Sequence, residues 1–285
     1  MTGRRRRASA WLLLVPALAL MVVVLFVPLA QSLYRSVATP TWTLEHYVSL
    51  FTDGVTMTVL ARTVLTAGIV TVSAFLIGYP YAYLMSRVGP RARAWLLVAV
   101  LVPFWTSVMA RNFAWIIILQ RGGPVDEFFS FFGIDGVVLY GSVWGVAVAM
   151  TQVLLPFMIL PLYSSLGSID RRLLLAARGL GSSPFAAFWR VYWPLSRAGA
   201  VSGIILVFTL SLGFYVTPAL LGSPQQSLVA QLLGTRTTQL LDFAGAGALG
   251  MLVLVVTLTL VAWANRIGGT ISAIGVVATS GSKGR

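Results

Sequence analysis

Residues 179–196 read GLGSSPFAAFWRVYWPLS and interrupt a chain that otherwise consists mostly of long apolar stretches. The segment places two glycines, two serines and a proline before a group of aromatic residues, and a second proline, Pro194, lies near its end. Glycine, serine and proline are typical of helix ends and turns. The segment therefore predicts a structured loop between two membrane helices.

The composition is that of an integral membrane protein. The 285 residues are 58% hydrophobic and 9% charged, whereas an ordinary soluble domain has about 25% charged residues. The chain has no cysteine and one histidine, His46, which excludes disulfides and thiolate metal sites and argues against a histidine-based metal or catalytic centre. A phosphate-binding Walker A motif is also missing. We therefore predict no catalytic residue, no metal site and no cofactor bound by this chain.

Six apolar stretches are long enough to cross a bilayer as helices. They are residues 11–33, 59–85, 95–119, 142–165, 199–219 and 244–265. Little sequence remains for a soluble domain. We therefore predict an all-α polytopic membrane protein with six transmembrane helices.

The charges predict the orientation of these helices. Fifteen of the 20 basic residues, but only one of the seven acidic residues, fall in segments 1–10, 86–94, 166–198 and 266–285. Basic residues collect on the cytoplasmic side of a membrane protein. The segments 1–10 and 266–285 are therefore predicted to be cytoplasmic tails that flank a membrane domain at 11–265. The net charge of +13 then reflects topology, and nucleic-acid binding is the weaker explanation.

The first apolar stretch has two interpretations. An arginine run followed by apolar residues has the order of a signal peptide. The apolar run from Trp11 to about Leu33 is longer than a signal-peptide core, and no A-x-A cleavage site follows it. We therefore expect an uncleaved first helix.

Two outer loops carry short helical patterns. In TWTLEHYVSLFTDG (41–54) the apolar residues recur at helical spacing, and in the second loop Pro124 and two acids precede an aromatic run, as at a helix start. Both segments are compatible with helices on the membrane surface and with docking of a partner.

Polar and aromatic residues within the spans are candidates for a translocation pathway. Arg111 is costly at membrane depth, so it should face a cavity or a partner, or else lie close enough to the outer end to snorkel or to pair with an outer acid such as Asp126. The predicted pathway residues are Trp105, Arg111, Asn112, Gln152, Phe214, Tyr215 and Asp242.

Within the loop 168–197 we expect two short helices. Residues 171–180 have a helical pattern, and Gly181 suits the left-handed residue that follows a helix. Ser183 can cap a second helix with Pro184 in its first turn, and Pro194 is expected to stop it. Phe185, Phe188, Trp189 and Tyr192 recur at i, i+3, i+4 and i+7, which predicts one aromatic face. Such a face fits either a groove on a partner protein or the headgroup layer of the membrane.

The loop resembles the cytoplasmic signature of permease subunits in binding-protein-dependent ABC importers. That signature is Glu-Ala-Ala, three residues, Gly, nine residues, Ile, one residue, Leu-Pro. Ala176, Ala177, Gly181 and Pro194 match it, and Val191 replaces the isoleucine. In two further positions Leu175 stands in place of the glutamate and Trp193 in place of the leucine. Segments 77–87, 101–125, 154–170 and 208–224 are similar to the spermidine/putrescine branch of this family.

The resemblance implies a permease with the type I ABC importer fold in the bacterial inner membrane, with both termini cytoplasmic, and not an enzyme. It also implies a second permease subunit, identical or different, two cytoplasmic ATPase subunits that bind ATP and Mg, and an external solute-binding protein. Residues 182–193 would form the coupling helix on the ATPase. The implied coupling residues are Ala176, Ala177, Gly181, Ser183, Pro184, Phe185, Phe188, Trp189, Tyr192 and Pro194. The implied cargo is a polyamine. The alternatives are a phosphonate or another small oxyanion and, less well supported, a secondary transporter.

Overall fold

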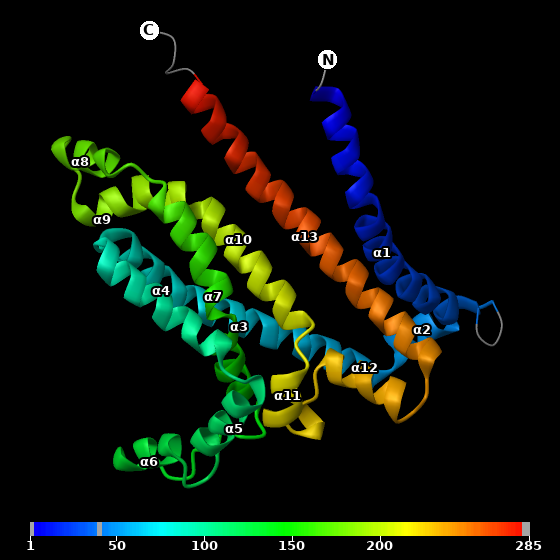
Figure 1. Cartoon of the computed structure of the whole chain (residues 1–285). Helices are drawn as coiled ribbons and strands as arrows, with labels where there is room; N and C mark the ends of the chain where they lie inside the picture. The colour runs from blue at the N-terminus through cyan, green and yellow to red at the C-terminus, as the bar shows by residue number, and fades with distance from the viewer. Residues whose placement is uncertain (1–2, 39–41, 281–285) are drawn as a thin grey trace. The chain divides into compact units, whose positions relative to one another are not determined.

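The computed structural model describes residues 3–38 and 42–280, and every regular element in that part of the chain is helical (Figure 1). In chain order the elements are α1 (Gly3–Ala38), α2 (Glu45–Thr52), α3 (Gly54–Arg87), α4 (Pro90–Trp105), α5 (Val108–Leu119), α6 (Pro124–Phe131), α7 (Val143–Gly167), α8 (Arg171–Gly179), α9 (Pro184–Ala187), the π-helical turn η1 (Phe188–Tyr192), α10 (Trp193–Leu212), α11 (Val216–Leu221), the 3₁₀ turn η2 (Pro224–Gln226), α12 (Val229–Thr238) and α13 (Phe243–Ser280).

The all-α polytopic prediction is confirmed. Five helical segments are long and apolar enough to cross a membrane: Leu18–Ala38, Gly54–Arg87, Val143–Gly167, Pro184–Leu212 and Phe243–Ala262. A bent pair of helices supplies a sixth span if it is counted as one. The helices at the two ends extend into the predicted tails, because α1 begins at Gly3 and α13 continues to Ser280. Two bases of the predicted C-terminal tail, Lys283 and Arg285, lie outside the described residues.

The predicted third span at 95–119 is broken in the structure. The segment Pro90–Trp105 and the following segment Val108–Phe131 are bent by 96° relative to each other. Pro103 has no N–H for the carbonyl four residues earlier, which weakens the last turn of α4. The Thr106 hydroxyl donates to the Pro103 carbonyl at 2.7 Å, and the Ser107 hydroxyl accepts the Ala110 N–H at 3.5 Å as the cap of α5. The polar side chains thus satisfy backbone groups that the break leaves without helical partners.

The fifth span is also shifted relative to the predicted 199–219. It runs from Pro184 to Leu212, and Gly213, a residue of low helix propensity, follows its last turn. The remaining predicted residues form the separate six-residue helix α11.

The described chain forms two compact units, residues 1–57 with 233–256 and residues 58–232 with 257–285. The second unit, called the larger unit below, has its core along α7, where Met150, Met158 and Leu162 are fully buried. Helix α10 packs along α7. Its Gly199 and Gly203 lie so close to α7 that an added Cβ would fall 2.4 Å from Ser165 Cβ and 2.8 Å from Met158 Sδ, respectively. Small residues allow this close helix contact.

The smaller unit, residues 1–57 and 233–256, contains the expected short helix after the first span as α2. Asp53 follows α2, and its carboxylate accepts the Val55 N–H at 3.1 Å and the Thr56 hydroxyl. These hydrogen bonds, first that of Thr56, lower the pKa of Asp53 below its ordinary value of 3.8. Arg236 donates to the Thr56 hydroxyl at 2.8 Å and pairs with Asp53 at 3.5 Å. The start of α3 is therefore tied to α12.

Candidate functional site

The first half of loop 168–197 is the helix α8 with defined ends. The Asp170 carboxylate accepts the Arg172 N–H at 2.9 Å and caps its start. At its end the Gly181 N–H bonds to the Arg178 carbonyl at 3.0 Å, and the Ser182 N–H bonds to the Ala177 carbonyl at 3.1 Å. Gly181 has φ +86°. These features form a Schellman motif and confirm that Gly181 ends the helix in the left-handed conformation.

The second helix begins as predicted. The Ser183 hydroxyl accepts the Ala186 N–H at 3.2 Å, and Pro184 is the first residue of α9. Proline fits this position because the N–H that it lacks would have no partner within the helix.

The prediction that Pro194 stops this helix is wrong. The chain passes from α9 through η1 into α10 without a break, and Pro194 lies in the first turn of α10. In η1 the Trp193 N–H bonds to the Phe188 carbonyl five residues earlier. The wider π turn changes the register of the backbone just before the proline, so the helix continues past a residue that donates no hydrogen bond.

The single aromatic face is wrong as well. Tyr192 is 3% exposed, and Phe188 is half-buried, whereas Phe185 and Trp189 are 74% and 48% exposed. The extra residue in the π turn rotates the later side chains relative to an ideal α-helix, so residues at i and i+7 no longer share a face. The four rings therefore divide into an inward pair, Phe188 and Tyr192, and an outward pair, Phe185 and Trp189.

The inward pair packs against the end of α3. Phe188 and Tyr192 contact the Tyr83 ring with centroid distances of 5.9 and 5.2 Å. The Tyr192 hydroxyl and the Ser86 hydroxyl are hydrogen-bonded at 3.1 Å, and the Arg87 guanidinium lies 4.9 Å from the Tyr83 ring centroid. The aromatic residues thus fix the loop to the membrane helix α3.

The outward side of the loop exposes large apolar side chains. We call Leu175, Leu180, Phe185 and Trp189 the exposed loop surface; their exposed fractions are 66%, 88%, 74% and 48%. Ala176 is exposed beside them, and Ala177 is half-buried. Leu180 was not predicted, although its position just before the helix-ending Gly181 was a signal for exposure.

A cavity of about 270 Å³ adjoins this surface. It is lined by Leu174, Leu175 and Arg178 of α8, by Pro184, Ala187 and Phe188, and by Tyr83 and Arg87 of α3. The sequence analysis did not identify the two α3 residues, since contacts between separate helices have no local signal.

Two of the predicted pathway residues, Trp105 and Arg111, lie on opposite sides of the break between α4 and α5. Trp105 is 76% exposed at the end of α4. Arg111 is half-buried in α5, donates from Nη2 to the Thr106 carbonyl at 3.1 Å, and has a buried Nε without a hydrogen-bond partner in the described chain. The alternative of an ion pair with Asp126 is not found among the described residues, where that carboxylate accepts the backbone N–H groups of Gly122 and Val137, each at 2.9 Å.

Asn112 and Gln152 are held by neighbours within the larger unit. Asn112 is 3% exposed and donates to the Val108 carbonyl at 2.9 Å. The Gln152 carbonyl oxygen accepts the Trp115 indole N–H at 2.7 Å, which joins α5 to α7.

The remaining pathway candidates belong to different units. Phe214 is half-buried and Tyr215 is 50% exposed, both in the larger unit. Asp242 belongs to the smaller unit, where it caps α13 through the Gly245 N–H at 2.8 Å and lies 3.9 Å from Arg236. Its carboxylate is thus already engaged by a helix end and a cation.

Comparison with known proteins identifies the family. Residues 74–267 match the model of the "Binding-protein-dependent transport system inner membrane component" family. The chain is 34% identical over 230 residues to the spermidine/putrescine transport system permease protein PotB of Haemophilus influenzae, covering 79% of this chain and 80% of that protein. PotB of Escherichia coli is 30% identical over 226 residues, covering 78% and 82%, respectively.

A solved structure shares the fold. The chain aligns with a TM-score of 0.74 and 18% identity to a chain in the crystal structure of a bacterial alginate ABC transporter in complex with an alginate pentasaccharide-bound periplasmic protein, covering 94% of this chain and 96% of that one. At this identity the match shows the fold alone. The family match covers more than half of the chain, so this protein belongs to the inner-membrane permease components of binding-protein-dependent ABC transport systems.

Proposed function

We propose that this chain forms half of the translocation pathway of an importer for a polyamine such as spermidine or putrescine. The proposed cargo rests on the similarity to PotB permeases over about four-fifths of the chain. The complete importer would contain a second permease subunit, identical or different, two cytoplasmic ATPase subunits that bind ATP and Mg, and an external solute-binding protein. Both termini and loop 168–197 would be cytoplasmic, which the distribution of basic residues supports.

The exposed loop surface would dock in a groove of the ATPase. Leu175 stands where the family signature has a glutamate, so this contact would be apolar where relatives have a charge. Phe185 and Trp189 are exposed and contact each other with a centroid distance of 6.2 Å. Closure of the ATPases on ATP would move this surface and, through the continuous helix from Pro184 to Leu212, shift the spans between inward-facing and outward-facing states.

Arg111 is the main physical objection to a cationic cargo, because it would repel a polyamine in the pathway. Its hydrogen bond to the Thr106 carbonyl directs part of the guanidinium to the break between α4 and α5. The backbone carbonyl offsets some of its charge, which supports a role in holding the break. Acidic groups for the cargo would then come from the second permease subunit, because Asp242 is bonded to Arg236 and to the start of α13.

An oxyanion such as a phosphonate is the second candidate, and the unpartnered Nε of Arg111 favours it. A secondary transporter is not proposed, since the chain belongs to an ABC transport family.

Reconstitution with the binding protein and the ATPase separates the two cargoes. We expect spermidine or putrescine to stimulate ATP hydrolysis in the wild type, and Arg111→Gln to retain that stimulation. Phosphonate and sulfate are the matched anionic probes. Stimulation by an anion alone, abolished in Arg111→Gln, would show that the cargo is an oxyanion.

A further inference from the structure

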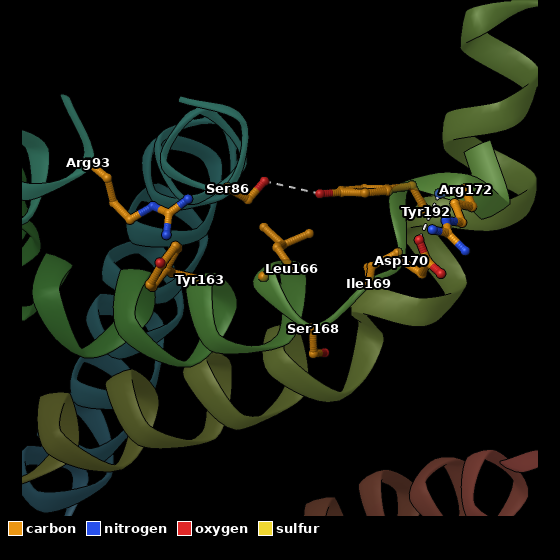
Figure 2. Close-up of a pocket in the computed structure, with 10 residues that line it drawn as sticks. Ser86, Arg93, Tyr163, Leu166, Ser168, Ile169, Asp170, Arg172 and Tyr192 are labelled. Atoms are coloured by element: carbon orange, nitrogen blue, oxygen red, sulfur yellow. Dashed lines mark hydrogen bonds between the residues drawn. The ribbon is translucent and has the colours of Figure 1, made fainter. Parts of the chain in front are cut away.

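A second cavity, of about 560 Å³, lies within the larger unit beside the start of loop 168–197. The ends of α3 and α7, the starts of α4 and α8, and η1 surround it (Figure 2). Its walls carry polar side chains, among them Ser86, Arg93, Tyr163, Asp170 and Arg172. No residue of the exposed loop surface or of the predicted pathway lines this cavity, and Tyr192 is the one implied coupling residue in its wall.

Arg93 supplies an incompletely bonded cation at one end. Its Nη2 donates to the Val88 carbonyl at 3.3 Å, and its guanidinium carbon lies 5.9 Å from the Tyr163 ring centroid. Its Nε is buried and has no hydrogen-bond partner within residues 3–38 and 42–280. A guanidinium has five N–H donors in a planar fork, and an unpaired buried donor is unfavourable. The Val88 carbonyl uses one N–H of Nη2, and the other N–H donors of the two Nη atoms are available to an acceptor in the cavity.

The other end carries charges of both signs. Asp170 and Arg172 lie across the cavity from Arg93, with Leu166 and Ile169 between the two ends (Figure 2). The Asp170 carboxylate is used in part by the Arg172 backbone N–H, and the Arg172 side chain is exposed. The cavity is thus cationic at one end, apolar in the middle and mixed at the other end.

The charges select the class of ligand. Two arginines and one aspartate give the lining one net positive charge. A phosphodiester carries one negative charge, which balances this net charge, whereas a phosphomonoester carries about 1.5 to 2 negative charges at neutral pH and would exceed it. The planar guanidinium fork matches two phosphate oxygens. The apolar middle accommodates the carbon groups esterified to the phosphate.

We propose that this cavity binds a phosphodiester, with its phosphate at Arg93. The ligand is either the headgroup of a phospholipid or a soluble phosphodiester, because both present the same monoanionic group. Its site joins α4 to the first residues of loop 168–197, so occupancy would restrain α8 relative to α4. The binding itself does not depend on the proposed transport function.

The test measures binding to the purified full-length chain in detergent. The probes are dioleoylphosphatidylglycerol in mixed micelles, soluble glycerophosphoglycerol and inorganic phosphate, and the dissociation constant is measured by microscale thermophoresis. We expect Arg93→Gln to weaken phosphodiester binding about tenfold or more, the loss typical of a hydrogen bond to a charged group. Arg91→Gln is the matched control, since Arg91 is exposed in the same turn of α4 and does not line the cavity. It should bind within about twofold of the wild type.

A second pair of variants tests the site independently if Arg93→Gln fails to fold. Arg172→Gln removes an exposed cavity residue and should also weaken binding, whereas Arg190→Gln, exposed in η1 outside the cavity, should not. Binding of the lipid alone would identify a headgroup site, and binding of both phosphodiesters would identify a site open to soluble ligands. Equal binding by all variants, absence of binding by the wild type, or tighter binding of inorganic phosphate than of either phosphodiester would overturn the proposal.

Discussion

Replacement of Trp189 by alanine should weaken docking of the ATPase without unfolding the permease. Trp189 is 48% exposed, and its other half contacts neighbouring rings, with centroids 5.7 Å from Phe188 and 5.7 Å from Trp193. A tryptophan side chain can bury about 200 Å², so about 100 Å² is available to a partner. At about 25 cal/mol per Å² this area corresponds to about 2.5 kcal/mol, or about a 60-fold increase in the dissociation constant.

The assay is titration of the purified ATPase against the detergent-solubilised permease. Trp95→Ala is the control, because Trp95 is 75% exposed in α4 and does not belong to the exposed loop surface. Tyr192→Ala should affect folding instead of docking. The Tyr192 ring is 3% exposed, so its loss should lower the free energy of unfolding by about 3 kcal/mol or more. Docking by Trp189→Ala within about twofold of the wild type would refute the assignment of this surface to the ATPase.

Three further predictions follow from other residues. Gly181→Val should destabilise the turn by about 1–2 kcal/mol through its positive φ, whereas Gly179→Ala, in a helix with open space around it, should stabilise α8 by up to about 1 kcal/mol; thermal unfolding and ATPase binding check both. The depressed pKa of Asp53 contributes stability that is present above its unfolded pKa and lost as pH falls below it. The difference in melting temperature between wild type and Asp53→Asn should therefore shrink between about pH 6 and about pH 3. In intact cells an impermeant thiol reagent should label Ser130→Cys, in an outer loop, and not Ser183→Cys, in the cytoplasmic loop. The reverse pattern would show that the predicted orientation in the membrane is wrong.

The ends of the loop helices could be predicted because they depend on a few neighbouring residues. Ser183 and Pro184 start α9 through one side-chain hydrogen bond and one missing N–H, and both features are local. Gly181 is similar, since its left-handed conformation is favoured by the absence of a Cβ. The surrounding protein does not have to be known for either inference.

The continuation of the helix beyond Pro194 depends on distant contacts, and the sequence therefore did not predict it. The Trp193 ring lies 5.5 Å from the Tyr79 ring, and the Tyr79 hydroxyl bonds to Ser196 at 2.9 Å. The Tyr79 ring also lies 6.1 Å from the Phe188 ring at the start of the π turn, so contacts with α3 hold both ends of the turn in one helical path. Proline alone favours a helix stop, and tertiary packing reverses that preference here.

The electrostatic partners were mispredicted for a related reason. Asp126 and Arg111 have opposite charges and lie 15 residues apart in the sequence, yet each is bonded to backbone groups. Helix ends and breaks expose N–H and carbonyl groups that compete with side-chain ions. Charge patterns alone therefore do not predict which atoms pair.

The π turn also has a mechanical consequence for coupling. Phe185 and Trp189 lie at the exposed beginning of the same continuous helix whose glycines, Gly199 and Gly203, pack directly on α7. An interruption at Pro194 would have left a hinge between the docking surface and the membrane span. Because the backbone hydrogen bonds continue through η1, the proposed coupling would move α10 together with the rings. The close packing of these glycines on Ser165 and Met158 of α7 would then pass this displacement to the core of the larger unit.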